Sequence, residues 1–88
     1  MTTLFILDVA DFRPLAEVAA RLPEVTVGRR GPYFTVSADA PFEIERAATG
    51  CRNAVWFSSV AAVRGGRVAR WDRTALRVEP DPTEGRSA

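Results

Sequence analysis

The sequence contains no histidine, and its single cysteine is Cys51. Without histidine the chain cannot form a Ser-His-Asp or Cys-His catalytic arrangement, an HExxH zinc site or a haem site with an axial histidine. A structural zinc site would need mostly carboxylate ligands, which such sites rarely use. Catalysis would have to rely on carboxylates, arginines, Tyr33 or Cys51. We therefore predict no catalytic residues, no metal and no cofactor, and we favour a non-enzymatic role.

Lysine is also absent, so all 12 basic residues are arginines. Long apolar runs are missing near the N-terminus, where Leu4–Leu7 gives a run of only four residues. A signal peptide needs about 7–15 apolar residues and a membrane-spanning helix about 20. With a single cysteine as well, we expect a cytoplasmic protein without membrane contact.

The length of 88 residues is that of one domain. A domain of this size buries only about 60–65% of its unfolded surface, so its stability is marginal unless something reinforces it. One cysteine cannot close an intrachain disulfide, which leaves a well-packed core or a partner subunit. We predict one α+β domain over residues 1–79, a mobile tail over residues 80–88, and association into a homodimer.

The first half of the chain predicts a strand, a helix and a hairpin. Residues 3–9 form an apolar run that is typical of a buried strand. Asp11 is a candidate N-cap for a helix that carries Pro14 in its first turn and ends at Pro23. Apolar residues recur along it at helical spacing, at Leu15, Val18, Ala19 and Leu22.

Two β-prone runs follow, at residues 24–27 and 33–37, joined by the Gly-rich connection 28–32. Alternation along these strands predicts outward-facing side chains at Thr26, Tyr33, Thr35 and Ser37. Residues 42–49 fit either a strand or a helix.

Residues 53–66 decide the fold class. Asn53 is a candidate N-cap, alanines occupy positions 54, 61 and 62, and Gly65 suits a helix C-terminus, so a helix is favoured over a strand. Residues 67–71 and 75–79 then form one bent strand or two strands. The helix gives the ferredoxin-like order β-α-β-β-α-β, in one small sheet with helices on one face. The alternative is β-α followed by an antiparallel meander.

Charge is unevenly distributed. Residues 1–51 carry five arginines and seven acidic residues, whereas residues 52–78 carry six arginines and one aspartate. The basic segment also contains Trp56, Phe57 and Trp71, a combination that nucleic-acid-binding surfaces use. The sequence pI is about 8.0, below the strongly basic range of such domains, so nucleic acid is not the expected partner.

Two places could bind an anion. Arg29 and Arg30 lie between glycines in the hairpin connection, where two guanidinium groups could hold a carboxylate or phosphate. Arg52 and Asn53 follow Cys51 at a junction between elements, where an arginine favours the thiolate. We predict ligand binding at Arg29, Arg30, Arg52 and Asn53.

The aromatic residues Tyr33, Trp56 and Trp71 are candidates for an interface, because tryptophan, tyrosine and arginine are enriched at interface hot spots. The prediction is a non-enzymatic accessory or binding module, a homodimer, with an arginine-lined surface for an acidic protein or an anionic small molecule. One alternative is a small enzyme that uses arginines with Cys51 or a carboxylate. The other is a protein that binds nucleic acid through residues 52–78.

Overall fold

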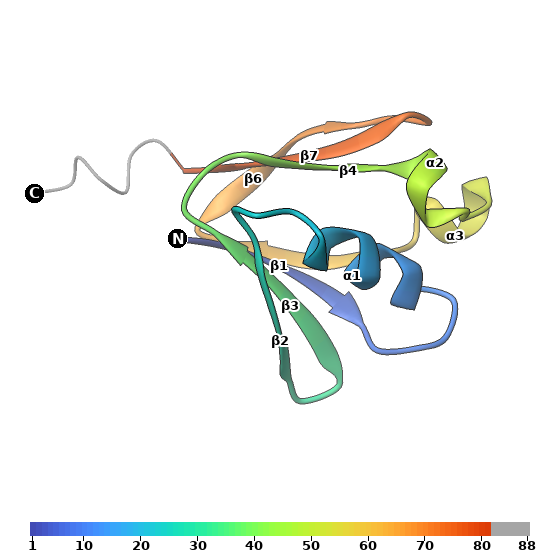
Figure 1. Cartoon of the computed structure of the whole chain (residues 1–88), viewed down its shortest axis with the longest axis horizontal. Helices are drawn as coiled ribbons and strands as arrows, with labels where there is room; N and C mark the ends of the chain where they lie inside the picture. The colour runs from blue at the N-terminus through green and yellow to red at the C-terminus, as the bar shows by residue number, and fades with distance from the viewer. Residues whose placement is uncertain (82–88) are drawn as a thin grey trace, which may run out of the picture.

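A computed structural model describes residues 1–81, in which antiparallel strands form two sheets (Figure 1). The strand order is β2-β3-β1-β5 in the four-stranded sheet and β4-β7-β6 in the three-stranded sheet. The elements along the chain are β1 (Thr2–Leu7), α1 (Arg13–Ala20), β2 (Thr26–Arg30), β3 (Tyr33–Ala38), β4 (Phe42–Glu45), α2 (Arg46–Thr49), α3 (Asn53–Trp56), β5 (Val60–Arg64), β6 (Gly66–Trp71) and β7 (Ala75–Pro80).

Alternation gives the four-stranded sheet one apolar face and one mixed face. On β1, Leu4 and Ile6 are fully buried, and they pair with Val36 and Phe34 of β3. Phe5 lies between them on the opposite face and pairs with Thr35. The β2–β3 hairpin turns at a glycine with φ of 58°, Gly31, as its Gly-rich connection predicts.

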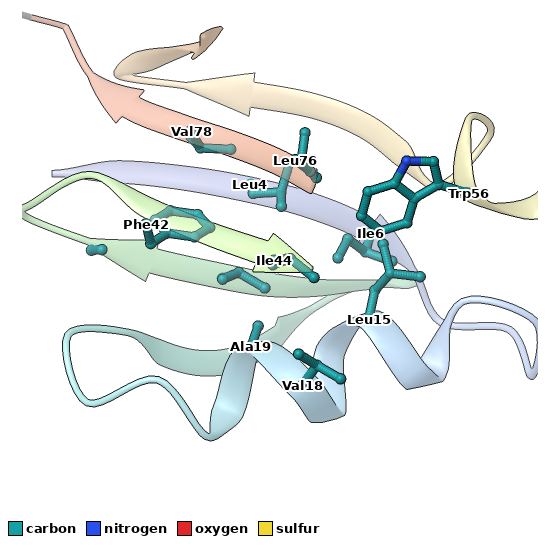
Figure 2. Close-up of a cluster of buried hydrophobic side chains, with 12 residues drawn as sticks. Leu4, Ile6, Leu15, Val18, Ala19, Phe42, Ile44, Trp56, Leu76 and Val78 are labelled. Atoms are coloured by element: carbon teal, nitrogen blue, oxygen red, sulfur yellow. The ribbon is translucent and has the colours of Figure 1, made fainter. Parts of the chain in front are cut away.

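The core lies against the apolar face of this sheet (Figure 2). Both α1 and the three-stranded sheet pack on that face, and together they form one cluster of buried side chains. Its members are Leu4, Ile6, Leu15, Val18, Ala19, Val36, Ala38, Phe42, Ile44, Trp56, Leu76 and Val78.

The helix predicted after the first strand is present as α1. Leu15, Val18 and Ala19 are buried in the core, as their spacing predicts. Asp11 is not the N-cap: that position is occupied by Phe12, which makes no side-chain capping bond. Pro14 lies in the first turn, where no intrahelical N–H is needed.

The predicted ferredoxin-like single sheet is wrong. The element order is β-α-β-β-β-α-α-β-β-β, and the strands divide between two sheets. The helix predicted over residues 53–66 is reduced to the single turn α3, with Arg52 rather than Asn53 at its N-cap position. Residues 60–64 form β5, because the free edge of β1 offers them a ladder, with Leu4 opposite Val63.

The structure also settles the two segments whose secondary structure the sequence leaves open, residues 42–49 and residues 67–79. Residues 42–45 form β4, whereas the residues that follow form the short helix α2, which ends at Gly50 with φ of 71°. The C-terminal segments form two strands, β6 and β7, that turn at Asp72 and Arg73. β7 lies between β4 and β6 in this sheet. The hairpin of β6 and β7 is therefore extended by β4, which comes from the middle of the chain.

The chain passes from one sheet to the other at Gly65 and Gly66. Gly65 has φ of 72°, and its carbonyl accepts hydrogen bonds from Thr2 Oγ1 at 3.0 Å and from the Asp81 N–H at 3.0 Å. Gly66 lies so close to its neighbours that a Cβ atom there would be 2.4 Å from the Glu79 carbonyl oxygen. Both glycines are therefore required by the crossing.

Pro80 is the last residue of β7, where it pairs with Gly66. Most of the tail predicted at residues 80–88 lies outside the described residues. None of the helices within residues 1–81 has the length and apolar character needed to cross a membrane.

Candidate functional site

The outer face of the four-stranded sheet is a candidate surface on which the fold brings polar and aromatic residues together. Within residues 1–81, the helices and the second sheet pack on the other side of this sheet. The outward residues of the two central strands are Thr3, Phe5, Leu7, Tyr33, Thr35 and Ser37. We call this surface the open face.

An aromatic pair lies on the open face, with Phe5 in the middle of β1 and Tyr33 at the start of β3. The rings of Phe5 on β1 and Tyr33 on β3 meet edge to face, with centroids 6.0 Å apart and planes at 88°. Beside them, the hydroxyls of Thr3 and Ser37 are hydrogen-bonded at 3.1 Å. Tyr33 therefore stands on an exposed sheet face, which is where the alternation of its strand predicts it.

Arginines from both edge strands flank this pair. Arg30 of β2 and Arg64 of β5 both line two adjoining hollows of about 620 and 460 Å³, to which Phe5 also contributes. No acidic residue lines either hollow. Within residues 1–81, the side chains of Arg30 and Arg64 form no ion pair. The open face is therefore cationic and uncompensated.

Arg29 is directed differently from its neighbour. It pairs with Phe34 in the ladder, on the opposite face from Arg30, and its guanidinium lies 5.4 Å from the centre of the Phe34 ring. It also forms an ion pair with Asp8, which Arg13 contacts at 3.3 Å. The register thus turns the two arginines toward opposite faces of β2, and Arg29 is paired with Asp8. Both residues nevertheless line the larger hollow.

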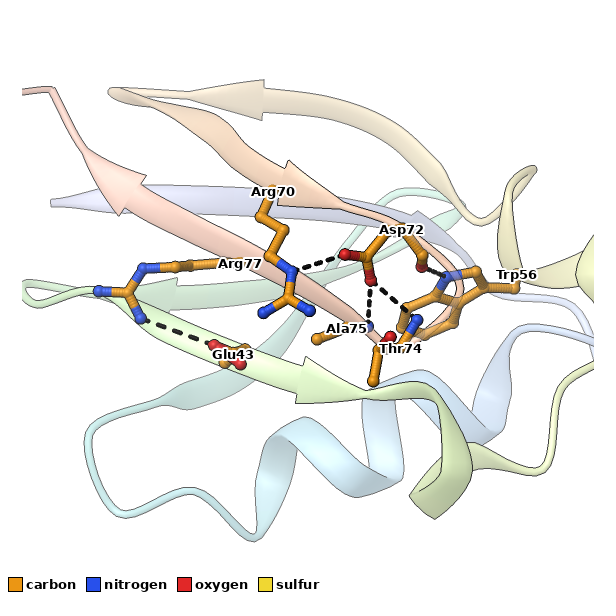
Figure 3. A network of polar contacts seen from close by, with 7 residues as sticks. All are labelled: Glu43, Trp56, Arg70, Asp72, Thr74, Ala75 and Arg77. Carbon is orange, nitrogen blue, oxygen red and sulfur yellow. Dashed lines mark hydrogen bonds and ion pairs between the residues drawn. The ribbon is translucent and has the colours of Figure 1, made fainter.

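The three-stranded sheet also carries arginines on its outer face, but these are paired. Figure 3 shows the pairs of Arg77 with Glu43 and of Arg70 with Asp72. Glu79 accepts hydrogen bonds from Arg77 Nε at 2.8 Å and Arg67 Nη2 at 3.0 Å. Arg77 also lies 3.7 Å from Glu43 of β4. The hydrogen bonds from Arg77 and then Arg67 lower the pKa of Glu79 below its ordinary value.

The β6–β7 turn is organised by Asp72. Its carboxylate accepts hydrogen bonds from Arg70 Nε at 2.7 Å and from the backbone N–H groups of Thr74 and Ala75 at 2.8 and 3.0 Å. These bonds, led by that from Arg70, hold the pKa of Asp72 well below its ordinary range. Three of the six arginines in residues 52–78 are thus engaged with carboxylates, which reduces the basic surface that a nucleic acid would need.

The two tryptophans are placed in different surroundings. Trp56 is fully buried, and its indole N–H donates a 2.7 Å hydrogen bond to the carbonyl of Asp72 (Figure 3). Its side chain therefore presents no surface to a partner. Trp71 is half-buried and packs against Phe57 with ring centroids 5.7 Å apart. Its buried Nε1 has no acceptor within residues 1–81, and Phe57 is 43% exposed.

Arg52 and Asn53 lie at the α2–α3 junction, away from the hairpin arginines. Arg52 and Cys51 line a hollow of about 410 Å³ against the β1–α1 loop, whereas Arg30 lines the hollows of the open face. The Cys51 thiol lies 3.9 Å from the Asp11 carbonyl, and the Cys51 carbonyl accepts a 3.0 Å bond from Arg46 Nε. The structure therefore does not bring the four residues predicted to bind a ligand into one site.

Sequence reasoning missed two members of the open face. Arg64 falls within the helix predicted over residues 53–66, a prediction that does not place it on a sheet edge. Phe5 lies in an unbroken apolar run, in which no polar residue marks which side chains face outward. In the structure Phe5 of β1 lies opposite Thr35 of β3. Because Thr35 is predicted to face outward, this pairing places Phe5 on the same outward face.

Comparison of the sequence with models of known families and with curated proteins finds no match. Comparison of the structure finds a similar chain in a complex of phenol hydroxylase with its regulatory protein. The TM-score is 0.72 at 18% sequence identity, and the match covers 91% of this chain and 98% of the other. The chain thus shares, over nearly its whole length, the fold of a small regulatory protein.

Proposed function

We propose that this chain is a small accessory protein that binds a larger enzyme of the hydroxylase class and regulates its activity. The observation that carries the proposal is the fold shared with the regulatory protein of a phenol hydroxylase complex, over 98% of that protein. A fold alone does not determine a function, so the residues of this chain must also suit the role.

The chemistry of the side chains supports a role through surface contacts. The pKa values of Arg70, Asp72, Arg77 and Glu79 are shifted, and all four residues belong to ion pairs on the three-stranded sheet. Such pairs stabilise a hairpin and do not mark a reactive centre. The single cysteine favours a cytoplasmic location, where an accessory protein would meet a metabolic enzyme.

The test is to recover the enzyme and to measure its turnover. The immobilised chain is incubated with an extract of the source cells, and bound proteins are identified by mass spectrometry. We expect a hydroxylase-type oxygenase, whose purified form changes its turnover saturably when the chain is added. The control is Leu4→Asp, which places a charge in the core and should unfold the domain. Failure to retain an oxygenase, or turnover that does not respond, would overturn the proposal.

Self-association is a second candidate, as the small core predicts. Within residues 1–81, strands β2, β5, β4 and β6 each have one edge without a partner strand. Unpaired edges are available for strand pairing with another copy. Sedimentation velocity at micromolar concentration tests this candidate, and a stable monomer would exclude it.

A further inference from the structure

We propose that the open face of the four-stranded sheet is the docking surface of this protein and that it receives an acidic surface of a partner protein. The identity of that partner as an oxygenase rests on the proposed function. The face itself and the charge of its occupant rest on contacts within this chain, so they can be tested separately.

The first argument is the contrast between the two sheets. On the three-stranded sheet, Arg67 and Arg77 are balanced by two carboxylates, because Arg77 is shared between Glu79 and Glu43, so these charges are paired internally. On the open face, Arg30 and Arg64 have no carboxylate partner within residues 1–81. Opposite charges across an interface favour association and suppress wrong partners. The carboxylates missing from this face are therefore best supplied by another molecule.

The second argument is the form of the surface. The two hollows share Phe5, Arg30 and Arg64, and they lie side by side on the exposed side of a sheet. Small-molecule sites enclose most of their ligand, which an exposed sheet face cannot do. A protein surface can instead lie over both hollows at once, because they adjoin and share three lining residues on one sheet face.

The third argument is the composition of the face. Aromatic residues and arginine are enriched at protein interfaces, and hot spots form where such residues cluster near the centre. Phe5 and Tyr33 lie in contact on the two central strands, while Arg30 and Arg64 come from the two edge strands. Each guanidinium can bind a carboxylate through two parallel hydrogen bonds. Acidic side chains around an apolar contact are the matching arrangement.

Nucleic acid would also be attracted by arginine and stacked by aromatic rings. A nucleic-acid surface, however, neutralises many phosphates along a basic stripe, whereas this face carries two unpaired arginines on a chain of net charge +1. An acidic protein surface is therefore the occupant that the charge favours.

The experiment uses NMR of the isotope-labelled chain with a glutamate-rich helical peptide as the probe, at low salt. We expect amide shifts in the outward residues of β1, β3 and β5, among them Phe5, Thr35 and Arg64. Shifts confined to the three-stranded sheet, or spread evenly over the molecule, would overturn the assignment. A single-stranded oligothymidylate is titrated in parallel. If it binds the open face more tightly than the peptide, the occupant is nucleic acid and the proposal is wrong.

Charge reversal provides the second measurement. The double variant Arg30→Glu and Arg64→Glu should weaken peptide binding about tenfold, because it replaces attraction by repulsion on the face. The matched control is Arg21→Glu with Arg73→Glu, which changes the net charge equally at exposed positions outside the open face. The control should retain the affinity of the natural chain. Equal weakening by both variants would mean that net charge alone is responsible.

The same variants separate this inference from the proposed function. If the oxygenase is retained equally by the natural chain and by Arg30→Glu with Arg64→Glu, the face is wrong and the regulatory role stands. If no oxygenase is retained but the acidic peptide maps to the open face, the regulatory role is wrong and the face stands. Unchanged circular dichroism of both variants shows that folding is not the cause.

Discussion

At Gly66 the chain leaves the four-stranded sheet for the three-stranded one, and no space remains there for a side chain. A Cβ atom would lie 2.4 Å from the carbonyl oxygen of Glu79 and 2.6 Å from the buried side chain of Thr2. Gly66→Ala should therefore lower the free energy of unfolding by about 1–3 kcal/mol, because both neighbours must move. Urea denaturation measures the loss. Gly31→Asn is the control, because asparagine tolerates positive φ and open space surrounds that position; a similar loss there would contradict the explanation.

Trp56 joins α3 to the β6–β7 turn through one hydrogen bond. Its indole N–H donates to the Asp72 carbonyl at 2.7 Å, while the ring is fully buried in the core. Trp56→Phe keeps an aromatic ring but removes the donor, so we expect a loss of about 1–3 kcal/mol in the free energy of unfolding. Thermal and urea denaturation check this value. Stability equal to that of the natural chain would show that the carbonyl finds another donor at no cost.

At the scale of the elements, the β6–β7 hairpin should be sensitive to acid. The pKa values of Asp72 and Glu79 are lowered in the folded chain, chiefly by hydrogen bonds from Arg70 and Arg77 respectively. A carboxyl group whose folded pKa is lowered contributes stability above its unfolded pKa and loses it as the pH falls through the folded value. Stability should therefore decrease as the pH falls below about 4.

The measurement is the thermal midpoint as a function of pH for the natural chain and for Asp72→Asn. The amide side chain does not titrate, so the variant should be less stable at neutral pH and should lose less on acidification. Parallel curves for the two proteins would contradict a role for Asp72 in the acid response. Because both carboxylates are partly exposed to solvent, salt should reduce the difference as well.

The elements also show what a single sequence can predict. Helix α1 and the β2–β3 hairpin follow from local signals, namely the spacing of Leu15, Val18 and Ala19 and the glycine-rich connection 28–32. In the structure the turn of that hairpin contains Gly31, with φ of 58°. Residues 60–64 carry alanines and a following glycine, which favour a helix locally. The second edge of β1 overrides that preference, because four residues of this segment pair with it. A pairing between segments so far apart in sequence cannot be recognised from the local sequence.

The candidate site is predictable to a similar extent. Alternation predicts the outward position of Tyr33 and its neighbours on β3, because that depends on one strand alone. The same alternation turns Arg29 and Arg30 toward opposite faces of β2. This orientation cannot be predicted while residues 28–32 are interpreted as a connection, because it requires the strand to continue to Arg30. Arg64 joins the open face through the β1–β5 pairing, so its role depends on two segments far apart in sequence.

At the scale of the whole molecule, two sheets share one core, and this predicts a single unfolding transition. Trp56 packs in a cluster that includes Leu4 of the four-stranded sheet and Leu76 of the three-stranded sheet. The sheets are also joined by β5 and β6 through Gly65, whose carbonyl is held by Thr2 and Asp81. Neither sheet can separate without exposing the apolar face of the other, so partial unfolding has no stable product.

We therefore expect the urea transition measured by tryptophan fluorescence to coincide with that measured by far-ultraviolet circular dichroism. Fluorescence reports the surroundings of Trp56 and Trp71, which lie at the end of the core and on β6, whereas circular dichroism reports the strands of both sheets. The same coincidence should hold for Gly66→Ala, at a lower midpoint and with an unchanged slope. Two separate transitions would show that the three-stranded sheet can unfold while the rest of the domain stays folded. The structure of the open face would then depend only on the four-stranded sheet and α1.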